Sequence, residues 1–239
     1  MRFPRSLALA AALAGTLASG LATGACAPRA TIDWRDVSYA GATAPAPARI
    51  ITFEQLKRSL ATPPPSTVVF DIDDTALRSS PAFLFGEGWF EGRGVARPHD
   101  DPAFWTFVND SLDARFSRPK LIALALVAMH QARGDTIVFL TGRSASTPPS
   151  DRTSLLLQRL FALPAPPRVV FTQQGPKVEA IRALHPAIAY GDADGDIRDT
   201  RAADPRIRPI RLLRSVYSSN ASRPTPGRFG EEVLAGSAD

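Results

Sequence analysis

The sequence predicts an α/β protein built on an open parallel sheet with helices on both faces. Five short runs rich in β-branched and aromatic residues alternate with helical stretches, which is the order typical of a parallel sheet. The 239 residues are enough for one domain with a full hydrophobic core and a small insertion. Composition agrees, because 44% hydrophobic and 21% charged residues are ordinary for a globular protein.

The N-terminal segment predicts export. Residues 1–25 have the form of a signal peptide, in which two arginines precede an apolar run over residues 7–21. That run is shorter than the ~20 residues that span a bilayer comfortably. Cys26 follows the small residues 22–25, which resemble a bacterial lipobox, whereas an ordinary secretory cut would fall after Ala27. The sequence favours a lipidated Cys26 and a periplasmic or membrane-anchored protein, and the secretory cut stays open.

A tether and a short helix come next. Residues 26–50 are rich in alanine and proline and predict a spacer before a domain over 51–239. Thr52 begins a predicted helix, with Gln55 in capping-box register, and the prolines at 63–65 end it.

The alternation of strands and helices occupies the rest of the chain. The predicted strands cover 67–72, 135–140, 168–171, 187–190 and 207–213, and the predicted helices 119–133, 151–162, 176–185 and 196–203. A glycine-rich stretch with an aromatic segment separates the first strand from the first long helix. We expect this stretch, about 79–118, to form a small, mainly helical insertion, or cap.

Two carboxylates follow the first strand directly. In the run Asp71-Ile72-Asp73-Asp74-Thr75, Asp71 and Asp73 are two residues apart and therefore share a face of extended chain. One could attack phosphorus while the other holds or delivers a proton. The alternative is a cluster of helix N-caps, because Asp and Thr are good capping residues.

Two weaker motifs suit phosphate binding. Thr141 and Gly142 follow the second strand, where a hydroxyl and the backbone N–H groups of a tight turn could hold phosphate oxygens. Lys177 lies near the predicted start of a helix, where its charge adds to the positive end of the helix dipole. Alone, each also reads as a common glycine turn or a surface lysine.

A third acidic group follows the fourth strand. Asp192, Asp194 and Asp196 are spaced by two, which suggests a hard cation with oxygen ligands. An EF-hand is excluded, because its glycine position holds Ile197 and its final glutamate position holds Ala203.

Electrostatics favours a cation at this point. Two carboxylates ~4 Å apart repel by about 4 kcal/mol at an effective dielectric of 20. If Asp71, Asp73, Asp192 and Asp196 gather at one edge of the sheet, some must protonate unless Mg²⁺ neutralises them.

The order of the motifs resembles the haloacid dehalogenase superfamily, and more closely the class B bacterial acid phosphatases. The likeness runs from about residue 50 to 233: residues 70–81 read FDIDDTALRSSP, 133–144 read RGDTIVFLTGRS, and 190–197 read YGDADGDI. The resemblance implies a magnesium-dependent acid phosphatase that acts on small phosphomonoesters.

The resemblance also implies roles for the motif residues. Asp71 would be the nucleophile and a Mg²⁺ ligand, and Asp73 the general acid and base that offers its backbone carbonyl to the metal. Asp192 would be the second side-chain ligand and Asp196 would support the metal site. Thr141, Gly142 and Lys177 would bind the phosphoryl group.

Substrate preference and assembly are implied as well. Phe83 and Trp105 fall where the family has an aromatic leaving-group pocket, although core packing would explain them equally. Aromatic and nucleoside monophosphates would be substrates, alcohols would accept phosphoryl groups, and the protein would be a homotetramer.

The charge pattern excludes one class of partner. The formal net charge is +5, but the basic residues are scattered and no basic run with interleaved aromatics occurs, so nucleic-acid binding is not expected. A non-catalytic envelope lipoprotein that uses the same fold as a binding module is the alternative function. The intact acidic motifs argue against it.

Overall fold

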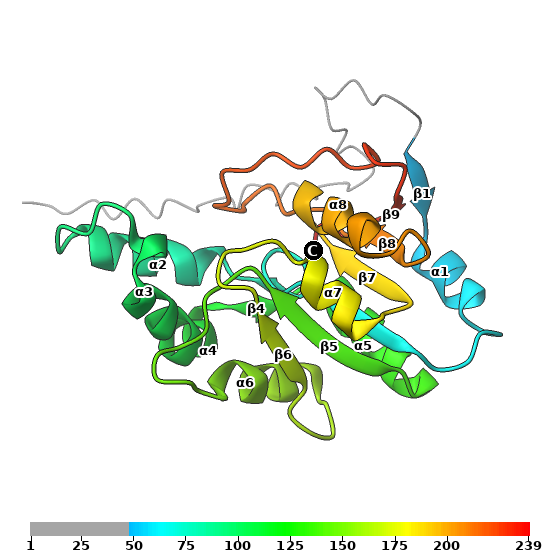
Figure 1. Ribbon diagram of the computed structural model, residues 1–239, viewed down its shortest axis with the longest axis horizontal. Helices are drawn as coiled ribbons and strands as arrows, with labels where there is room; N and C mark the ends of the chain where they lie inside the picture. The colour runs from blue at the N-terminus through cyan, green and yellow to red at the C-terminus, as the bar shows by residue number, and fades with distance from the viewer. Residues whose placement is uncertain (1–47) are drawn as a thin grey trace, which may run out of the picture. The chain divides into compact units, whose positions relative to one another are not determined.

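The structure, a computed structural model, describes residues 48–239. The predicted signal peptide and Cys26 lie outside the described residues. Seven strands form one parallel sheet in the order β1-β9-β8-β7-β2-β5-β6 (Figure 1). Their bounds are β1 Arg49–Ile51, β2 Thr67–Phe70, β5 Thr136–Thr141, β6 Arg168–Phe171, β7 Ile188–Gly191, β8 Arg208–Arg211 and β9 Glu232–Leu234.

Helices cover both faces of this sheet, as the sequence predicts. Alternate residues of each strand point to opposite faces, so Phe70 packs into one apolar cluster and Val69 into another. The first cluster is closed by α1, α5 and α6, and the second by α7 and α8, which lie in front of the sheet in Figure 1. Their bounds are α1 Phe53–Ser59, α5 Leu121–Arg133, α6 Arg152–Phe161, α7 Val178–Leu184 and α8 Asp194–Ala203.

Local signals set several of these boundaries. Thr52 and Gln55 form the predicted capping box at the start of α1. Gly134 adopts φ 79° directly after α5, a left-handed conformation that costs glycine little. Two predicted helices begin later than expected, because Pro119 belongs to strand β4 and Lys177 is the N-cap of α7.

The insertion after β2 is mainly helical. It contains α2 Ser80–Glu91, the 3-10 turn η1 Pro98–Asp100, α3 Pro102–Phe107, the π-helical turn η2 Val108–Leu112 and α4 Asp113–Phe116. An antiparallel pair, β3 Leu77–Arg78 with β4 Arg118–Pro119, joins its two ends to the core. Ala82, Phe104, Trp105, Val108 and Leu112 form its own buried cluster. This cap therefore carries a small core separate from that of the sheet.

One predicted boundary is wrong. The tether was expected to reach residue 50, but Arg49 and Ile50 belong to β1, which pairs with β9 in parallel register. Arg49 also forms an ion pair with Glu232, its partner in that register, at 3.2 Å. A three-residue edge strand that pairs with a strand more than 180 residues later leaves no local periodicity in the sequence, so the pattern could not indicate it.

A closed polar network lies inside the core between α5 and the sheet. His130 places Nδ1 2.6 Å from Asp135 Oδ2 and Nε2 2.8 Å from the hydroxyl of Tyr190. Asp135 also accepts from Arg133 Nε at 2.9 Å and from the Ser66 amide at 2.8 Å. We call His130, Asp135 and Tyr190 the His130 network. Its contacts are those of a structural element, because each polar atom has a protein partner.

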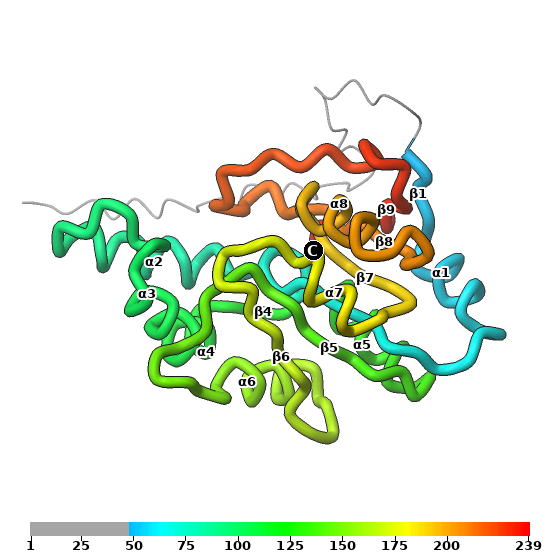
Figure 2. The backbone as a smooth tube through the Cα atoms, viewed as in Figure 1, coloured from blue at the N-terminus to red at the C-terminus, as the bar shows by residue number. Residues whose placement is uncertain are grey.

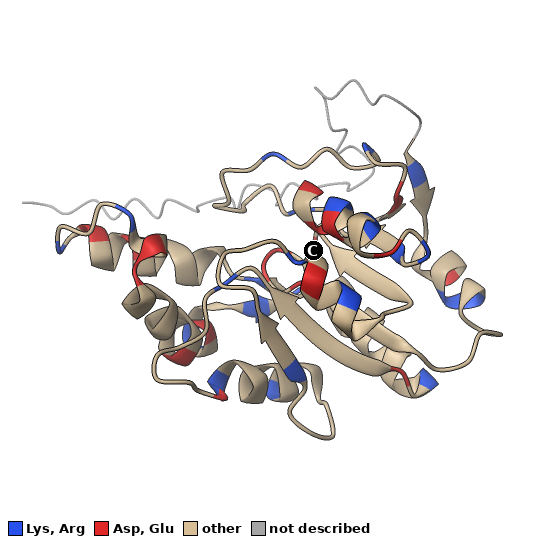
Figure 3. Cartoon of the chain, viewed as in Figure 1, with Lys and Arg blue, Asp and Glu red and all other residues tan. Residues whose placement is uncertain are grey.

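Two further properties of the helices concern their charge and their length. Figure 3 shows Lys and Arg interspersed with Asp and Glu over the helices, in keeping with the scattered basic residues of the sequence. Within residues 48–239, every helix is too short or too polar to cross a bilayer.

Candidate active site

Three carboxylates meet at the carboxyl edge of the sheet. Asp71 directly follows β2 and Asp192 directly follows β7, and these strands are neighbours with Phe70 paired to Tyr190. Asp196 comes from the first turn of α8. One carboxylate oxygen from each of the three lies within 4.8 Å of the others. We call Asp71, Asp192 and Asp196 the acidic cluster, and its hard oxygen donors fit a divalent cation such as Mg²⁺.

A glycine allows the third carboxylate to come close. A Cβ on Gly191 would lie 2.4 Å from Asp196 Cβ, so no other residue fits between the end of β7 and the first turn of α8. Asp196 is held there because its Oδ2 accepts from the Ala193 amide at 3.0 Å. The glycine that precedes the acidic motif is therefore a steric requirement of the cluster.

Lys177 pairs with two of the three carboxylates of the acidic cluster. Its Nζ donates to Asp71 Oδ1 and, at 2.7 Å, to Asp196 Oδ1. Its amide donates to Asp199 Oδ2 at 2.8 Å, which fixes the start of α7 against α8. Burial disfavours the charged ammonium, but Asp196 and Asp71 outweigh it and raise the pKa of Lys177. The lysine is charged at every physiological pH.

One lysine does not neutralise three carboxylates. Burial raises the pKa of Asp71 well above its usual range; Lys177 opposes this, and Asp196, Asp192 and Asp73 add to it. Burial, followed by Asp196, raises the pKa of Asp192 to about 6. Without a bound cation the cluster therefore favours taking up protons. That is the electrostatic behaviour of an oxygen-ligand cation site.

Asp73 has a different environment from Asp71. Arg143 donates to it through two nitrogens, Nε to Oδ2 at 2.9 Å and Nη2 to Oδ1 at 2.6 Å. Burial would raise the pKa of Asp73, but the Arg143 guanidinium outweighs burial and lowers it. Two carboxylates two residues apart thus have their pKa values moved in opposite directions, because only Asp73 has an arginine that bonds both of its oxygens.

Arg143 also joins the carboxyl edge of the sheet to the cap. Its Nη1 donates to Asn109 Oδ1 at 3.0 Å and to the buried carboxylate of Asp113. Asn109 belongs to η2, and its amide nitrogen donates to the Ser144 carbonyl at 3.0 Å. The π-helical turn therefore meets the loop that follows β5, a placement often seen at functional sites.

The two phosphate-binding candidates on β5 lie beside this arginine. Thr141 is the last residue of β5, and its Oγ1 accepts from the Arg143 amide at 3.2 Å. A Cβ on Gly142 would meet nothing within 4 Å, so open space adjoins the backbone at this turn. The Gln174 amide donates to the Gly142 carbonyl at 2.6 Å and ties the turn to the loop after β6.

The comparisons with known proteins agree with this geometry. The family model of the HAD superfamily, subfamily IIIB (Acid phosphatase), matches residues 46–155. The class B acid phosphatase of Klebsiella pneumoniae is 38% identical over 234 residues, 95% of this chain and 95% of that protein. The Salmonella typhimurium class B acid phosphatase is 39% identical over 203 residues, 80% of this chain and 81% of its own length. The chain belongs to the class B acid phosphatases.

Solved structures agree on the fold. CbbY from Rhodobacter sphaeroides in complex with phosphate superposes with a TM-score of 0.52 at 15% identity, covering 72% of this chain and 95% of that one. That likeness concerns the α/β fold alone. Membership of the family makes this chain a phosphatase that acts on small phosphomonoesters.

The two aromatic candidates of this acid phosphatase differ in position. Trp105 is buried in the cap cluster, and its Nε1 donates to the His99 carbonyl at 2.8 Å. Phe83 is only partly buried and lies 5.2 Å from the Arg143 guanidinium, measured to the ring centroid. The two rings meet edge to face, with centroids 6.0 Å apart. Phe83 therefore lies beside Arg143, and Trp105 packs edge to face against Phe83.

The sequence motifs missed three residues of this phosphatase site. Arg143 was part of a recognised motif but had no assigned role, and its bond to Asp73 became visible only in three dimensions. Asp113 and Arg214 carried no signal at all. Arg214 Nε donates to Asp192 Oδ2, while Thr75 Oγ1 donates to Asp192 Oδ1 at 3.1 Å.

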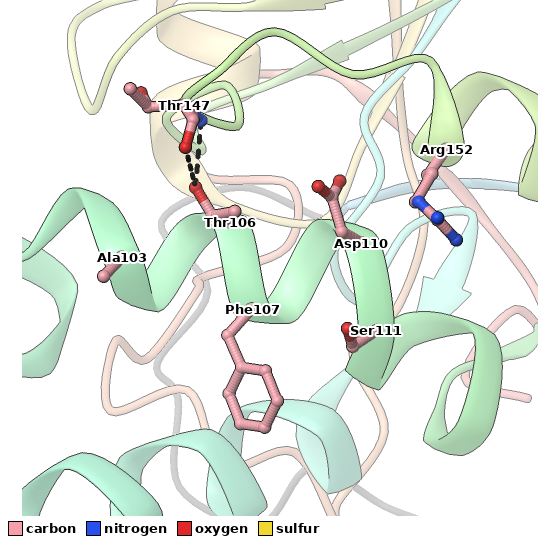
Figure 4. A pocket seen from close by; sticks show the side chains of 7 residues that line it. All are labelled: Ala103, Thr106, Phe107, Asp110, Ser111, Thr147 and Arg152. Carbon is pink, nitrogen blue, oxygen red and sulfur yellow. Dashed lines mark hydrogen bonds between the residues drawn. The ribbon is translucent and has the colours of Figure 1, made fainter.

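A cavity of about 480 Å³ lies outside this site, between α3, η2 and the loop after β5 (Figure 4). Thr106 Oγ1 accepts from the Thr147 amide across it at 2.9 Å. Its lining does not include any residue of the acidic cluster. It is formed by Ala103, Thr106, Phe107, Asp110, Ser111, Thr147 and Arg152.

Proposed function

We propose that this phosphatase hydrolyses phosphate monoesters through a phosphoaspartate on Asp71, with Mg²⁺ bound at the acidic cluster. The convergence of Asp71, Asp192 and Asp196 within 4.8 Å, beside Lys177, is the observation that carries the proposal. Hard carboxylate oxygens and an uncompensated negative charge suit Mg²⁺. The backbone carbonyl of Asp73 is the further ligand that the family resemblance implies.

Bound Mg²⁺ would offset the repulsion between the carboxylates and the phosphate and polarise the phosphoryl oxygens. The remaining work belongs to residues of the chain. An Asp71 oxygen attacks phosphorus, the bond from phosphorus to the ester oxygen breaks, and Asp73 gives its proton to that oxygen. Lys177, the Thr141 hydroxyl and the backbone N–H groups at Gly142 hold the other phosphoryl oxygens.

The second step regenerates the enzyme. Water attacks phosphorus, Asp73 takes a proton from it, and the bond between phosphorus and Asp71 breaks to release phosphate. Because Arg143 lowers the pKa of Asp73, its acid form is populated only in acidic solution. This supports a phosphatase whose first step is favoured at low pH.

The leaving group would lie against Phe83, with Trp105 behind it, which favours aryl phosphates and nucleoside monophosphates. Small alcohols could replace water in the second step and accept the phosphoryl group. We also propose that the protein assembles as a homotetramer, by resemblance to its family.

Export and anchoring form a separate part of the proposal. The apolar run over 7–21 and the small residues before Cys26 support lipidation of Cys26 and a tether facing the periplasm or cell exterior. A Cys26→Ser variant should release active enzyme from the membrane fraction or accumulate as precursor. A wild-type protein whose mature N-terminus lies downstream of Cys26 would contradict this part.

Hydrolysis of p-nitrophenyl phosphate, with Mg²⁺ and with a chelator, tests the central claim. We expect turnover that the chelator abolishes and added Mg²⁺ restores. The alternative, a non-catalytic envelope lipoprotein, predicts no turnover under either condition. Turnover that is indifferent to the chelator would overturn the magnesium assignment but leave the phosphatase activity standing.

A further inference from the structure

The loop between β8 and β9 is tied to the acidic motifs. This C-terminal loop, residues 214–231, contains no helix or strand, and Figure 2 shows it running past α8 before it returns to β9. Four of its residues bond to the motif loops or to the first turn of the cap. The pairs are Arg214 with Asp192, Ser218 Oγ with Asp74 Oδ2 at 2.6 Å, the Ser219 amide with Ser80 Oγ at 2.8 Å, and the Thr225 amide with Asp194 Oδ1 at 2.9 Å.

Arg214 makes the most buried of these ties. Its Nε donates to Asp192 Oδ2, and its Nη1 donates to Ser222 at 2.7 Å for the carbonyl and 2.9 Å for the hydroxyl. The side chains of Arg214 and Asp192 are only 5% and 3% exposed. One guanidinium therefore joins a residue of the acidic cluster to the far side of the loop and closes residues 215–221 into a ring.

Asp192 is held from two sides. Thr75 engages one of its oxygens and Arg214 the other, so the orientation of the carboxylate depends on both donors. Partners that orient a metal-binding carboxylate typically change metal affinity by about ten- to a hundredfold when they are removed.

We propose that Arg214 is a positioning residue that couples Mg²⁺ binding at Asp192 to the ordering of the C-terminal loop. This rests on the proposed magnesium site. A cation that fixes the Asp192 carboxylate gives the Arg214 fork a fixed acceptor, and Ser222 then holds the loop in place. Because coupling between binding and ordering is reciprocal, a loosened loop weakens Mg²⁺ binding in turn.

The sign of the effect separates positioning from simple charge. A guanidinium next to a metal ligand repels the cation, so charge alone predicts that Arg214→Gln binds Mg²⁺ more tightly. Positioning predicts the opposite, an affinity lower by about ten- to a hundredfold. Calorimetric titration of the full chain with Mg²⁺ alone measures this without reference to turnover.

Amide hydrogen exchange measures the order of the C-terminal loop. In the wild type, Mg²⁺ should slow amide exchange over residues 214–231 relative to protein in chelator, and Arg214→Gln should abolish that slowing. Arg228→Gln is the matched control, because it removes the same charge from the same loop. Arg228 is 59% exposed, pairs with Asp194 at 3.7 Å and lies over the ring of its neighbour Phe229, so this variant should keep both the protection and the affinity.

Two further variants keep the test decisive. Ser218→Ala cuts the tie to Asp74 and does not touch Asp192; it should speed loop exchange without metal and also lower Mg²⁺ affinity. Arg214→Lys retains the charge but cannot reach both Asp192 and Ser222. It should fold and lose the loop protection, and it therefore replaces Arg214→Gln in the test if that variant does not fold. Exchange in β2, β5 and β7 reports whether each variant is folded.

Three results would overturn the inference: loop exchange that ignores Mg²⁺ in the wild type, protection that survives in the Arg214 variants, or tighter Mg²⁺ binding by Arg214→Gln. A Ser218→Ala protein with a loosened loop and unchanged affinity would do the same. If the wild type binds no Mg²⁺, the proposed metal site fails together with the coupling. If the wild type binds Mg²⁺ and amide exchange in the C-terminal loop does not change, only the coupling fails.

Discussion

Two buried polar groups of this molecule differ in how completely their charges are partnered. In the His130 network, His130 lies between Asp135 and Tyr190, and Arg133 and the Ser66 amide complete the set. In the acidic cluster, Asp71 and Asp196 share Lys177, and Asp192 pairs with Arg214, which also lies 3.5 Å from Asp74. The first group is closed and contributes to stability. The second carries an unbalanced negative charge, which a bound cation and a substrate would offset.

The direction of the pKa shifts follows from this difference. Burial lowers the pKa of His130, which stays neutral and donates through Nδ1 to Asp135 while accepting from Tyr190. Burial alone would raise the pKa of the Asp135 carboxyl. The hydrogen bonds from His130, Ser66 and Arg133 outweigh burial, and the pKa of Asp135 is lowered. In the acidic cluster burial wins, and the pKa values of Asp71 and Asp192 rise. A complete set of donors reverses the effect of burial on a carboxylate.

The largest expected effect comes from a substitution in the acidic cluster. Asp71→Asn should abolish turnover, because phosphate monoesters hydrolyse so slowly in water that losing the covalent step costs many orders of magnitude. Unfolding in chelator should show no loss of stability, since the variant removes one of the repelling carboxylates and Asp196 still pairs with Lys177. A clean preparation that retains more than a few per cent of the wild-type rate would exclude Asp71 as the nucleophile.

Asp73→Asn should give a smaller, substrate-dependent loss. The backbone carbonyl survives this change, whereas proton delivery to the leaving oxygen does not. Rates should therefore fall least for p-nitrophenyl phosphate, whose leaving group needs little protonation, and most for alkyl phosphates. Equal losses on both substrates would argue against a general acid at this position.

A substitution in the His130 network should lower the stability of the protein and leave its turnover number unchanged. Asp135→Asn removes the charge that His130 and Arg133 bond, and should lower the free energy of unfolding by about 2 kcal/mol. The turnover number of the folded variant should match that of the wild type. Denaturant unfolding and an activity assay on the same sample measure the stability and the turnover number. A turnover number that also falls in the folded variant would contradict a purely structural role for the His130 network.

The smallest effect concerns pH. His130 has a lowered pKa in the folded state, so below the unfolded value of about 6.5 the unfolded chain binds a proton that the native protein does not. The stability that neutral His130 contributes is thus present above pH ~6.5 and is lost as pH falls, by up to ~1.4 kcal/mol per pH unit.

The raised carboxylates of the acidic cluster change stability in the opposite direction, so the wild type alone does not isolate this term. The stability difference between wild type and His130→Gln does. It should shrink as the pH is lowered from 7.5 to 5, and a constant difference would show that His130 does not titrate on unfolding.

The sequence by itself determined the fold class and placed the acidic motifs at the carboxyl edge of the sheet. Asp71 and Asp73 both follow the first strand, so their nearness is a local property, but in the structure Asp73 bonds Arg143 and stands outside the acidic cluster. Periodicity likewise indicated five of the seven strands, β2, β5, β6, β7 and β8, and the long helices. The family resemblance rested on these same short runs, and the comparisons confirm it.

Only the tertiary structure decided which charges complete the site. Asp113 reaches Arg143 from the cap, 30 residues away along the chain, and Arg214 reaches Asp192 from beyond β8, 22 residues away. The pairing of β1 with β9 spans nearly the whole described chain. No spacing rule connects such residues, because their contacts depend on the order of strands in the sheet and on how the cap docks. Local sequence could place the carboxylates of the acidic motifs, whereas packing selected the partners that orient them.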